Sequence, residues 1–212
     1  MCYGLFQALR DIQKMATTHK TSTRKKKLDW IKAGQSLLIE AGIDAVKLHP
    51  LSKKLDISTG SFYHHFKSFE GYLSALADFY GTEQAQLPFD EARNLIGNDP
   101  EQRLRAATAI FAAGSGRQLN VAMRAWAHRD QCAFDAIHRY DKVLMKNLDA
   151  IFIDLGFDEI AAKSRTLMMM ALASIDLDPT LMNPSYTDRW HYIRDTMILD
   201  GNQQLSSKNP KS

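Results

Sequence analysis

The stretch KLHPLSKKLDISTGSFYHHF, residues 47–66, predicts two short helices joined by a tight turn. Pro50 suits the first turn of a helix, because the N–H that proline lacks would have no partner there. Asp56 tolerates a left-handed or turn conformation, so the first helix can end beside it. Ser58 can then accept a hydrogen bond from the free N–H groups of a second helix, which we expect over residues 59–66.

The second helix has one apolar side and one polar side. Phe62 and Phe66 are four residues apart and therefore point to the same side, which predicts that they pack into a core. The side chains left on or near the outer face are polar, and none of them is acidic: Thr59, Ser61, Tyr63, His64 and His65. A short exposed helix of this composition suits the major groove of DNA.

This stretch resembles the DNA-binding domain of the TetR family of transcriptional regulators. The family pattern S-x-G-[ST]-[FL]-Y-x-[HY]-F, followed by a short Lys/Ser turn, is matched here by Ser58, Gly60, Ser61, Phe62, Tyr63, His65, Phe66, Lys67 and Ser68. The resemblance covers residues 24–80 well. It continues more loosely through MRAWAHRD at 123–130, RYDK at 139–142 and LGFD at 155–158.

Helical periodicity and this resemblance together predict an all-α fold. An N-terminal three-helix domain over residues 24–80 would carry the helix-turn-helix at 47–66. The resemblance implies that a larger helical domain over residues 81–200 binds an effector and forms a dimer.

Prolines and glycines predict where individual helices begin and end. Pro88 and the polar residues that follow it predict a break between two helices. Asp99 and Pro100 then predict the start of the next helix. Gly156 predicts the end of a long helix over residues 130–155.

The two ends of the chain lack the pattern of a packed domain. Residues 1–23 read as a flexible N-terminal extension, in which Met1 and Met15 are both candidate start positions. Residues 201–212 are polar and read as a disordered tail.

Charge is distributed unevenly along the chain. Residues 1–67 hold 12 Lys/Arg and 5 Asp/Glu, whereas residues 68–212 hold 15 and 19. A basic N-terminal third suits a polyanionic partner such as double-stranded DNA. Lys25, Lys26 and Lys27 lie directly before the first predicted helix, where we expect them to contact phosphates.

The resemblance implies DNA contacts from the second helix and the lysine behind it, namely Thr59, Gly60, Ser61, Tyr63, His64, His65 and Lys67. We expect His64 to read a base edge, because this position faces the groove and varies in chemistry within the family. Asp56 and Phe69 depart from the family, which usually has glycine and a basic or polar residue at these positions. A third departure, at 47–49, removes a hydroxyl that would bind a phosphate, and we expect Lys47 or His49 to take over that contact.

The C-terminal helices are rich in methionine and aromatic side chains. By resemblance, an effector cavity is expected at Phe111, Met123, Trp126, Phe134 and Met168. The family's dimer interface is expected on the last two helices, at Leu167, Ala171, Leu172, Ile175, Trp190, Ile193 and Met197. For both sets the alternative is ordinary packing of a helical core.

Composition and motifs weigh against several other classes. A hydrophobic content of 45% and a charged content of 24% are typical of globular proteins, and no apolar run approaches the ~20 residues of a membrane span. With only Cys2 and Cys132, we expect no disulfide framework and a cytoplasmic location. His128, Cys132 and His138 lack the spacing of a metal site. The chain also shows no phosphate-binding glycine loop and no nucleophile elbow, so we expect no metal, no cofactor and no catalytic residue.

The sequence therefore predicts a one-component transcriptional regulator. We expect a homodimeric repressor that binds a palindromic operator and is released by a small-molecule effector. One alternative is a DNA-organising or interaction protein with the same DNA-binding domain and no effector. The other is a small helical enzyme.

Overall fold

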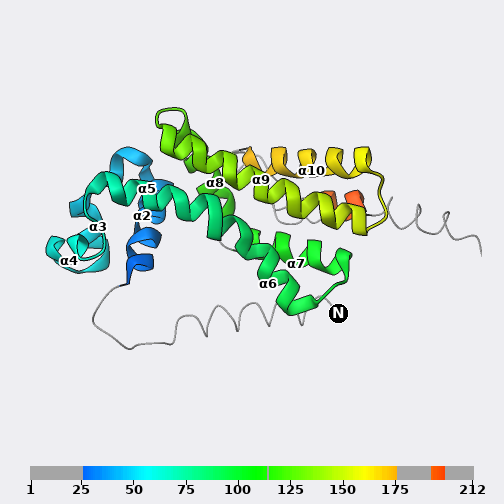
Figure 1. Ribbon diagram of the computed structural model, residues 1–212, viewed down its shortest axis with the longest axis horizontal. Helices are drawn as coiled ribbons and strands as arrows, with labels where there is room; N and C mark the ends of the chain where they lie inside the picture. The colour runs from blue at the N-terminus through cyan, green and yellow to red at the C-terminus, as the bar shows by residue number, and fades with distance from the viewer. Residues whose placement is uncertain (1–25, 114, 176–191, 199–212) are drawn as a thin grey trace, which may run out of the picture.

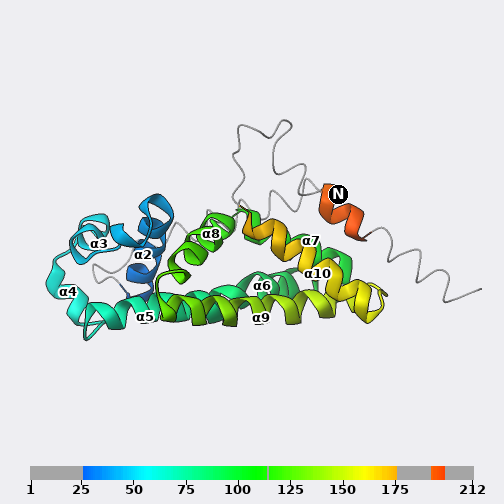
Figure 2. The ribbon, with the colours of Figure 1, turned by 90° about the horizontal axis from the view of Figure 1, so that it is seen from above.

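The computed structural model describes residues 26–113, 115–175 and 192–198. Every regular element in these ranges is helical, and no strand occurs among them, which confirms the predicted all-α class. The molecule is elongated, with the predicted helix-turn-helix at one end (Figures 1 and 2). Among the sequence-based expectations, Lys25, Trp190 and the segments 1–23 and 201–212 lie outside the described residues.

The N-terminal end holds four short elements, namely α2 (Lys27–Ala41), the 3₁₀ turn η1 (Ile43–Ala45), α3 (Leu48–Leu55) and α4 (Thr59–Tyr63). Their core is aromatic. The ring of Phe62 lies 5.3 Å from that of Trp30 and 5.4 Å from that of Tyr72, in edge-on contacts. The Tyr72 hydroxyl donates to the Trp30 carbonyl at 3.0 Å, so its one polar group is satisfied inside the core.

One long helical stretch, which contains a π-helical turn, leads from this core into the rest of the molecule. Its parts follow without a gap: α5 (Phe69–Phe79), the π-helical turn η2 (Tyr80–Gln84) and α6 (Ala85–Ile96). The predicted break at Pro88 is therefore wrong, because Pro88 lies inside α6. A proline ring clashes with the carbonyl four residues earlier in a regular helix. Here that residue is Gln84, the last of the wider π-helical turn, which gives the ring its space.

Four further helices follow along the described chain, namely α7 (Pro100–Ala113), α8 (Gly116–Ala127), α9 (Gln131–Asp154) and α10 (Glu159–Ser174). The side chains of Asp99, Asp130 and Asp158 accept hydrogen bonds of 2.8–3.2 Å from N–H groups in the first turns of α7, α9 and α10. After α9, Gly156 takes a φ of 95°, as the prediction of a helix end there requires. A helical segment also spans residues 192–198.

The helix α9 is the central helix of the larger part of the molecule, which is the part that follows α5. It runs from the end of α5 to the end of the molecule opposite α4, and it packs against η2, α6, α7, α8 and α10 (Figure 2). Two apolar cores form along it. The first joins the N-terminal helices to α8 and the start of α9, so that Trp30 and Phe62 share it with Trp126 and Ile137. The second lies between α6, α7, α10 and the end of α9.

The expected domain boundary at residue 80 falls within the first core. Tyr80 is 1% exposed and belongs to the same buried cluster as Trp30. The helix-turn-helix and the larger part are therefore in direct apolar contact. Across residues 26–113, 115–175 and 192–198, the chain has no helix with the length and apolar character to cross a membrane.

Candidate functional site

The turn between α3 and α4 is built by residues 56–58. Asp56 has φ 55° and ψ 49°, the left-handed conformation expected for it. The Ile57 N–H donates to the Ser52 carbonyl at 3.1 Å, a bond that closes the end of α3. Pro50 lies in the first turn of α3, as predicted. The short turn fixes how α4 lies relative to α3.

The helix α4 differs in two details from its prediction. It ends at Tyr63 instead of residue 66, and the side chain of Ser58 makes no capping hydrogen bond. The backbone satisfies the turn instead, because the Ser61 N–H donates to the Ser58 carbonyl at 3.1 Å. Beyond α4, the N–H groups of His65 and Phe66 both donate to the Phe62 carbonyl, at 2.9 and 3.0 Å. This bend returns Phe66 to the core.

The outer face of α4 is accessible, as expected. Phe62 is fully buried and anchors the helix to the aromatic core. The predicted contact residues lie on the surface, with Ser61 and His65 half-buried and the rest exposed: Thr59, Gly60, Tyr63, His64 and Lys67. No acidic residue lies between Asp56 and Glu70. This face therefore offers hydrogen-bond donors and acceptors without negative charge.

Basic side chains surround α4. The Lys27 ammonium nitrogen lies 5.6 Å from the centroid of the Phe66 ring, so the start of α2 lies close to the residues that follow α4. Lys26 is exposed there too, and Lys47 and His49 are exposed at the start of α3. The structure thus gathers the described part of the predicted set at one end of the molecule (Figure 1).

Lys53 is an exposed lysine of α3 that the predicted set left out. The sequence already indicated that Lys53 points outward from α3, and this signal could have added it to the predicted DNA contacts. Its neighbour Lys54 is engaged differently, because its ammonium group lies 2.8 Å from a carboxylate oxygen of Glu40. This hydrogen bond lowers the pKa of Glu40. Lys53 therefore extends the basic face, whereas Lys54 serves to tie α3 to α2.

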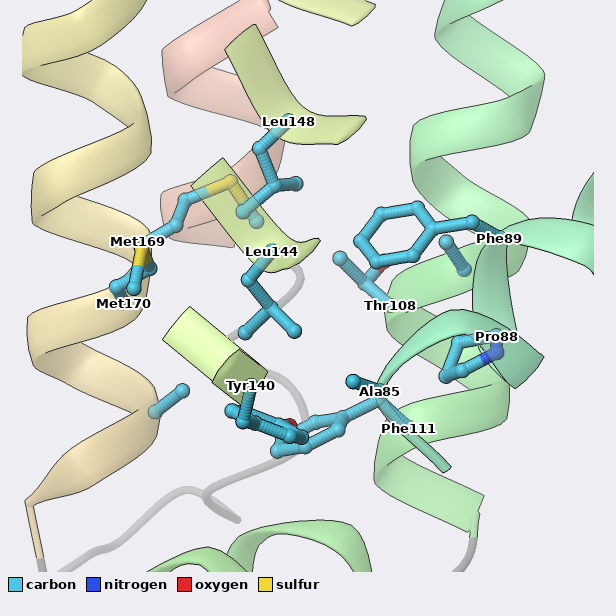
Figure 3. Close-up of a pocket in the computed structure, with 12 residues that line it drawn as sticks. Ala85, Pro88, Phe89, Thr108, Phe111, Tyr140, Leu144, Leu148, Met169 and Met170 are labelled. Carbon is cyan, nitrogen blue, oxygen red and sulfur yellow. The ribbon is translucent and has the colours of Figure 1, made fainter. Parts of the chain in front are cut away.

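A second site is a small apolar cavity, partly open to solvent, in the larger part of the molecule. Four helices line it: α6 with Ala85, Pro88 and Phe89, α7 with Ala107, Thr108 and Phe111, α9 with Tyr140, Leu144 and Leu148, and α10 with Met169, Met170 and Ala173. Figure 3 shows the two methionines facing Phe89 across the cavity, with Tyr140 and Phe111 at one end. Among the residues that the structure describes, no charged side chain lines it.

The structure places the five residues that we expected at an effector cavity in different surroundings. Among them only Phe111 lines this cavity. Met123 and Trp126 are buried in the first core, where α8 packs against α2. Phe134 and Met168 lie on the outer faces of their helices and are exposed. Periodicity identified the apolar positions but could not tell which helix each of them faces.

One end of the cavity adjoins a buried polar network. Tyr140 stacks on Tyr80 with ring centroids 4.4 Å apart and an interplanar angle of 10°. The Tyr80 hydroxyl donates to Oδ1 of Asn120 at 2.8 Å, and Asn120 Nδ2 donates to the Ala173 carbonyl at 3.1 Å. Burial raises the pKa of both tyrosines, so both are neutral. The network therefore joins the π-helical turn, α8, α9 and α10.

Arg124 completes this network on its outer side. Its Nε donates to Asn120 Oδ1 at 3.2 Å, and its two terminal nitrogens donate to the carboxylate of Asp141 at 2.6 and 3.3 Å. This paired geometry holds the guanidinium group in place. Asn120 is thereby fixed from two sides.

A row of exposed apolar side chains follows one face of α10. The row has helical spacing and consists of Ile160, Leu167, Met168, Ala171 and Ile175. Ile160 and Leu167 are 81% and 64% exposed. An isolated helix face of this kind usually marks an association surface.

The predicted dimer residues divide into two groups. Leu167, Ala171 and Ile175 belong to the exposed row. Leu172, Ile193 and Met197 are half-buried, and Leu172 and Met197 pack against the second core. Among the described residues of the predicted set, those in the row on α10 are therefore the exposed ones.

The three residues considered as metal ligands differ in their exposure to solvent. Cys132 is half-buried, and burial raises the pKa of its thiol. His128 and His138 are exposed. Within the described ranges, no three His, Cys, Asp or Glu side chains are grouped as metal ligands would be.

Comparison with known proteins agrees with this arrangement. Residues 31–76 match the family of bacterial regulatory proteins of the tetR type. This match contains α3, α4 and most of α2 and α5. None of the curated proteins matches the chain in sequence.

The whole fold is similar to several solved structures. A TetR transcriptional regulator from Legionella pneumophila has a TM-score of 0.62 at 12% identity, over 90% of this chain and 100% of its own. A transcriptional regulator from Rhodococcus sp. Rha1 has a TM-score of 0.61 at 16% identity, over 86% and 97%. GusR of Salmonella enterica has a TM-score of 0.60 at 19% identity, over 88% and 98%. At these identities the likeness establishes a shared fold.

Proposed function

Since the chain carries a tetR-type regulatory domain on the fold of TetR-family transcriptional regulators, we propose that it is a homodimeric, ligand-responsive repressor. It binds a palindromic operator in the cytoplasm and leaves that operator when a small molecule fills the C-terminal cavity. The observation that carries this proposal is the outer face of α4, which is polar, free of acidic side chains and bordered by lysines.

The chemistry of α4 suits two kinds of DNA contact. Lys26, Lys27, Lys47 and Lys67 supply positive charge for phosphates, which gives affinity for any duplex. Ser61 lies on α4 and His64 directly follows its last residue, and both supply the hydrogen bonds that distinguish one base pair from another. Because α4 is short, one copy reads only a few base pairs, and a specific site needs two copies.

The apolar row on α10 offers a surface on which the second copy of the chain can pack. A two-fold dimer brings the same surface of each subunit together, so a row centred on Leu167 and Ala171 meets its own counterpart. Small side chains such as Ala171 allow two helices to approach closely. The row lies at a distance from α4, which leaves both recognition helices free to reach DNA (Figure 2).

Selection of bound sequences from a pool of random duplexes tests the DNA-binding part of the proposal. The protein is expected to enrich an inverted repeat whose half-sites lie about one helical turn, or a small multiple of it, apart. Enrichment of a single, unrepeated half-site would contradict the dimeric arrangement. An unchanged pool, even at low ionic strength, would contradict sequence-specific binding.

Sedimentation velocity tests the dimer independently of DNA. Replacement Leu167→Glu places a charge in the centre of the apolar row and is expected to yield monomers at concentrations where the unchanged protein is a dimer. Leu95→Glu, at an exposed leucine near the end of α6, is the matched control and should leave the dimer intact. Equal dimer stability of both variants would contradict an interface on α10.

A further inference from the structure

The wall of the cavity contains almost no polar chemistry. Within the described part of the chain, the only side-chain hydroxyls on this wall are those of Thr108 and Tyr140. The Thr108 hydroxyl is already engaged, because it donates to the Leu104 carbonyl at 2.8 Å. A ligand in this space therefore meets aromatic, aliphatic and thioether groups, with few hydrogen bonds to gain.

One charged group lies behind the wall. A guanidinium nitrogen of Arg194 is 3.5 Å from the Thr108 hydroxyl oxygen. Its charge is balanced, since Asp195 pairs with Arg194 at 2.8 Å and with Arg105. An anionic ligand would enter the cavity without a free counter-charge, and burial of an unpaired charge is strongly unfavourable. An uncharged apolar molecule carries no such cost.

The cavity also adjoins a direct path to the recognition helix. Tyr140, on its wall, stacks on Tyr80, and Tyr80 begins the π-helical turn that continues α5. The start of α5 in turn belongs to the aromatic core that anchors α4, where the Tyr72 ring lies 5.4 Å from that of Phe62. Movement of Tyr80 therefore displaces the helix on which the DNA-binding end is mounted.

The π-helical turn has little freedom to absorb such a movement locally. A Cβ atom on Gly81 would lie 2.7 Å from the carbonyl oxygen of Ala136, so the turn already touches the backbone of α9. The Tyr80 hydroxyl is held by Asn120, and Asn120 binds the carbonyl of Ala173, another residue of the cavity wall. A shift of either wall residue is thus passed to Tyr80.

We propose that the cavity binds an uncharged, predominantly apolar small molecule, and that Tyr140 and Asn120 pass its presence through Tyr80 to α5 and so to α4. This inference rests on the proposed function, because it specifies the effector class and the route by which the effector acts. The molecule presses on Tyr140 and α10, Tyr80 follows, and the recognition helix leaves the position that fits the operator. Tyr80 is a positioning residue in this scheme, since it touches neither ligand nor DNA.

Two dyes with the same aromatic skeleton test the ligand class. N-phenyl-1-naphthylamine is uncharged, whereas 8-anilino-1-naphthalenesulfonate carries one negative charge. Fluorescence titration of the full chain is expected to show binding of the neutral dye at one site per chain, at least about tenfold tighter than that of the sulfonate. Equal or tighter binding of the sulfonate would overturn the assignment. Benzyl alcohol and benzoate, compared by thermal melting, repeat the test with smaller molecules.

Cavity-filling replacements test whether the dye binds in the cavity. Ala107→Leu fills the space from α7 and is expected to weaken binding of the neutral dye by about tenfold or more. Met170→Phe fills it from α10 and serves as the second variant if the first is unstable. Leu95→Ser removes an exposed leucine of α6 and should leave dye binding unchanged. Loss of binding in Leu95→Ser, with none in the filled variants, would place the dye on the surface and overturn the proposal.

Tyr80→Phe tests the route. In the unchanged protein, saturating neutral dye is expected to weaken binding of the selected duplex by about tenfold, a usual coupling strength. In Tyr80→Phe, which keeps the stack on Tyr140 but loses the hydrogen bond to Asn120, the dye should bind within about threefold of its normal affinity while its effect on DNA falls to about threefold. An undiminished effect on DNA in this variant would overturn the role of Tyr80.

The two levels of the proposal fail in different ways. Binding of the ligand-free protein to the selected duplex reports only on DNA recognition and is measured first. Intact DNA binding without neutral-dye binding would overturn the ligand class alone. Dye binding in the cavity without any DNA binding would instead overturn the proposed repressor function.

Discussion

Tyr80 and Tyr140 lie face to face, with ring centroids 4.4 Å apart and planes inclined by 10°. Tyr80 belongs to the helix that leads to the DNA-binding end, and Tyr140 belongs to the wall of the cavity. This pair of rings therefore links the wall of the cavity to the helix that carries the DNA-binding end. The contact lies in the first apolar core, away from water.

Replacement Tyr80→Phe keeps the aromatic stack and removes the buried hydroxyl that donates to Asn120. We expect the free energy of unfolding to fall by about 1 kcal/mol, because Oδ1 of Asn120 loses the Tyr80 hydroxyl but keeps Arg124 as a donor. Urea denaturation followed by circular dichroism measures the change. Tyr63→Phe, at an exposed tyrosine, is the control and should unfold as the unchanged protein does. An equal effect of both replacements would argue against the buried hydrogen bond.

Replacement Asp56→Gly should stabilise the protein. Asp56 is the only residue other than glycine with positive φ in the described ranges, and a left-handed backbone costs an L-residue of this kind about 1 kcal/mol relative to glycine. We expect thermal melting to show a higher midpoint for Asp56→Gly and a lower one for Asp56→Val, whose branched side chain disfavours this conformation. The opposite order would show that the Asp56 side chain makes a contribution that outweighs its backbone strain.

Replacements His64→Ala and Lys27→Ala should separate base reading from phosphate binding. On the selected operator, His64→Ala is expected to lose about 1–3 kcal/mol of discrimination between matched and mismatched base pairs. Lys27→Ala is expected to weaken binding to all duplexes and to reduce the slope of log K against log salt by about 1. Fluorescence anisotropy at several salt concentrations measures both. Equal losses of both variants on operator and random DNA would contradict this division.

The ion pair between Asp44 and Arg129 should give a small acid-dependent stability. Arg129 donates to both carboxylate oxygens of Asp44, at 3.0 and 3.3 Å, and this hydrogen bonding lowers the pKa of Asp44. A lowered carboxyl pKa stabilises the folded state above the unfolded value of about 4, and the stabilisation disappears as pH falls through the lowered value. The melting point of Arg129→Gln should therefore lie slightly below that of the unchanged protein from pH 7 to 5, and the two should converge below about pH 4. A constant difference down to pH 3 would contradict this role of the pair.

Much of the fold follows from local sequence signals. Pro50, Asp56 and Gly156 act as predicted because their preferences depend on their own backbone conformation. The acidic caps Asp99 and Asp158 mark helix starts for the same reason. The outer face of α4 was also predictable, since Phe62 and Phe66 define its buried side.

The remaining features depend on contacts between distant residues. Pro88 predicted a break, but the π-helical turn before it lets the helix continue, and no local signal in the tyrosine-containing turn indicates that geometry. Met123 and Trp126, which we expected at a cavity, lie in the first core, because periodicity shows that a helix has an apolar face and does not show which neighbour covers it. The pairing of Tyr80 with Tyr140 joins residues 60 positions apart and could be seen only once the helices were placed.

Methylation interference on the selected duplex tests the central claim most directly. Methylation of guanine N7 blocks contacts in the major groove, where we place α4. The account predicts interference in two groups of guanines that are related by the two-fold axis and lie about one helical turn, or a small multiple of it, apart. The interference pattern should fade in His64→Ala and persist in Lys27→Ala. Binding that is indifferent to guanine methylation throughout the protected sequence would contradict recognition by α4 in the major groove.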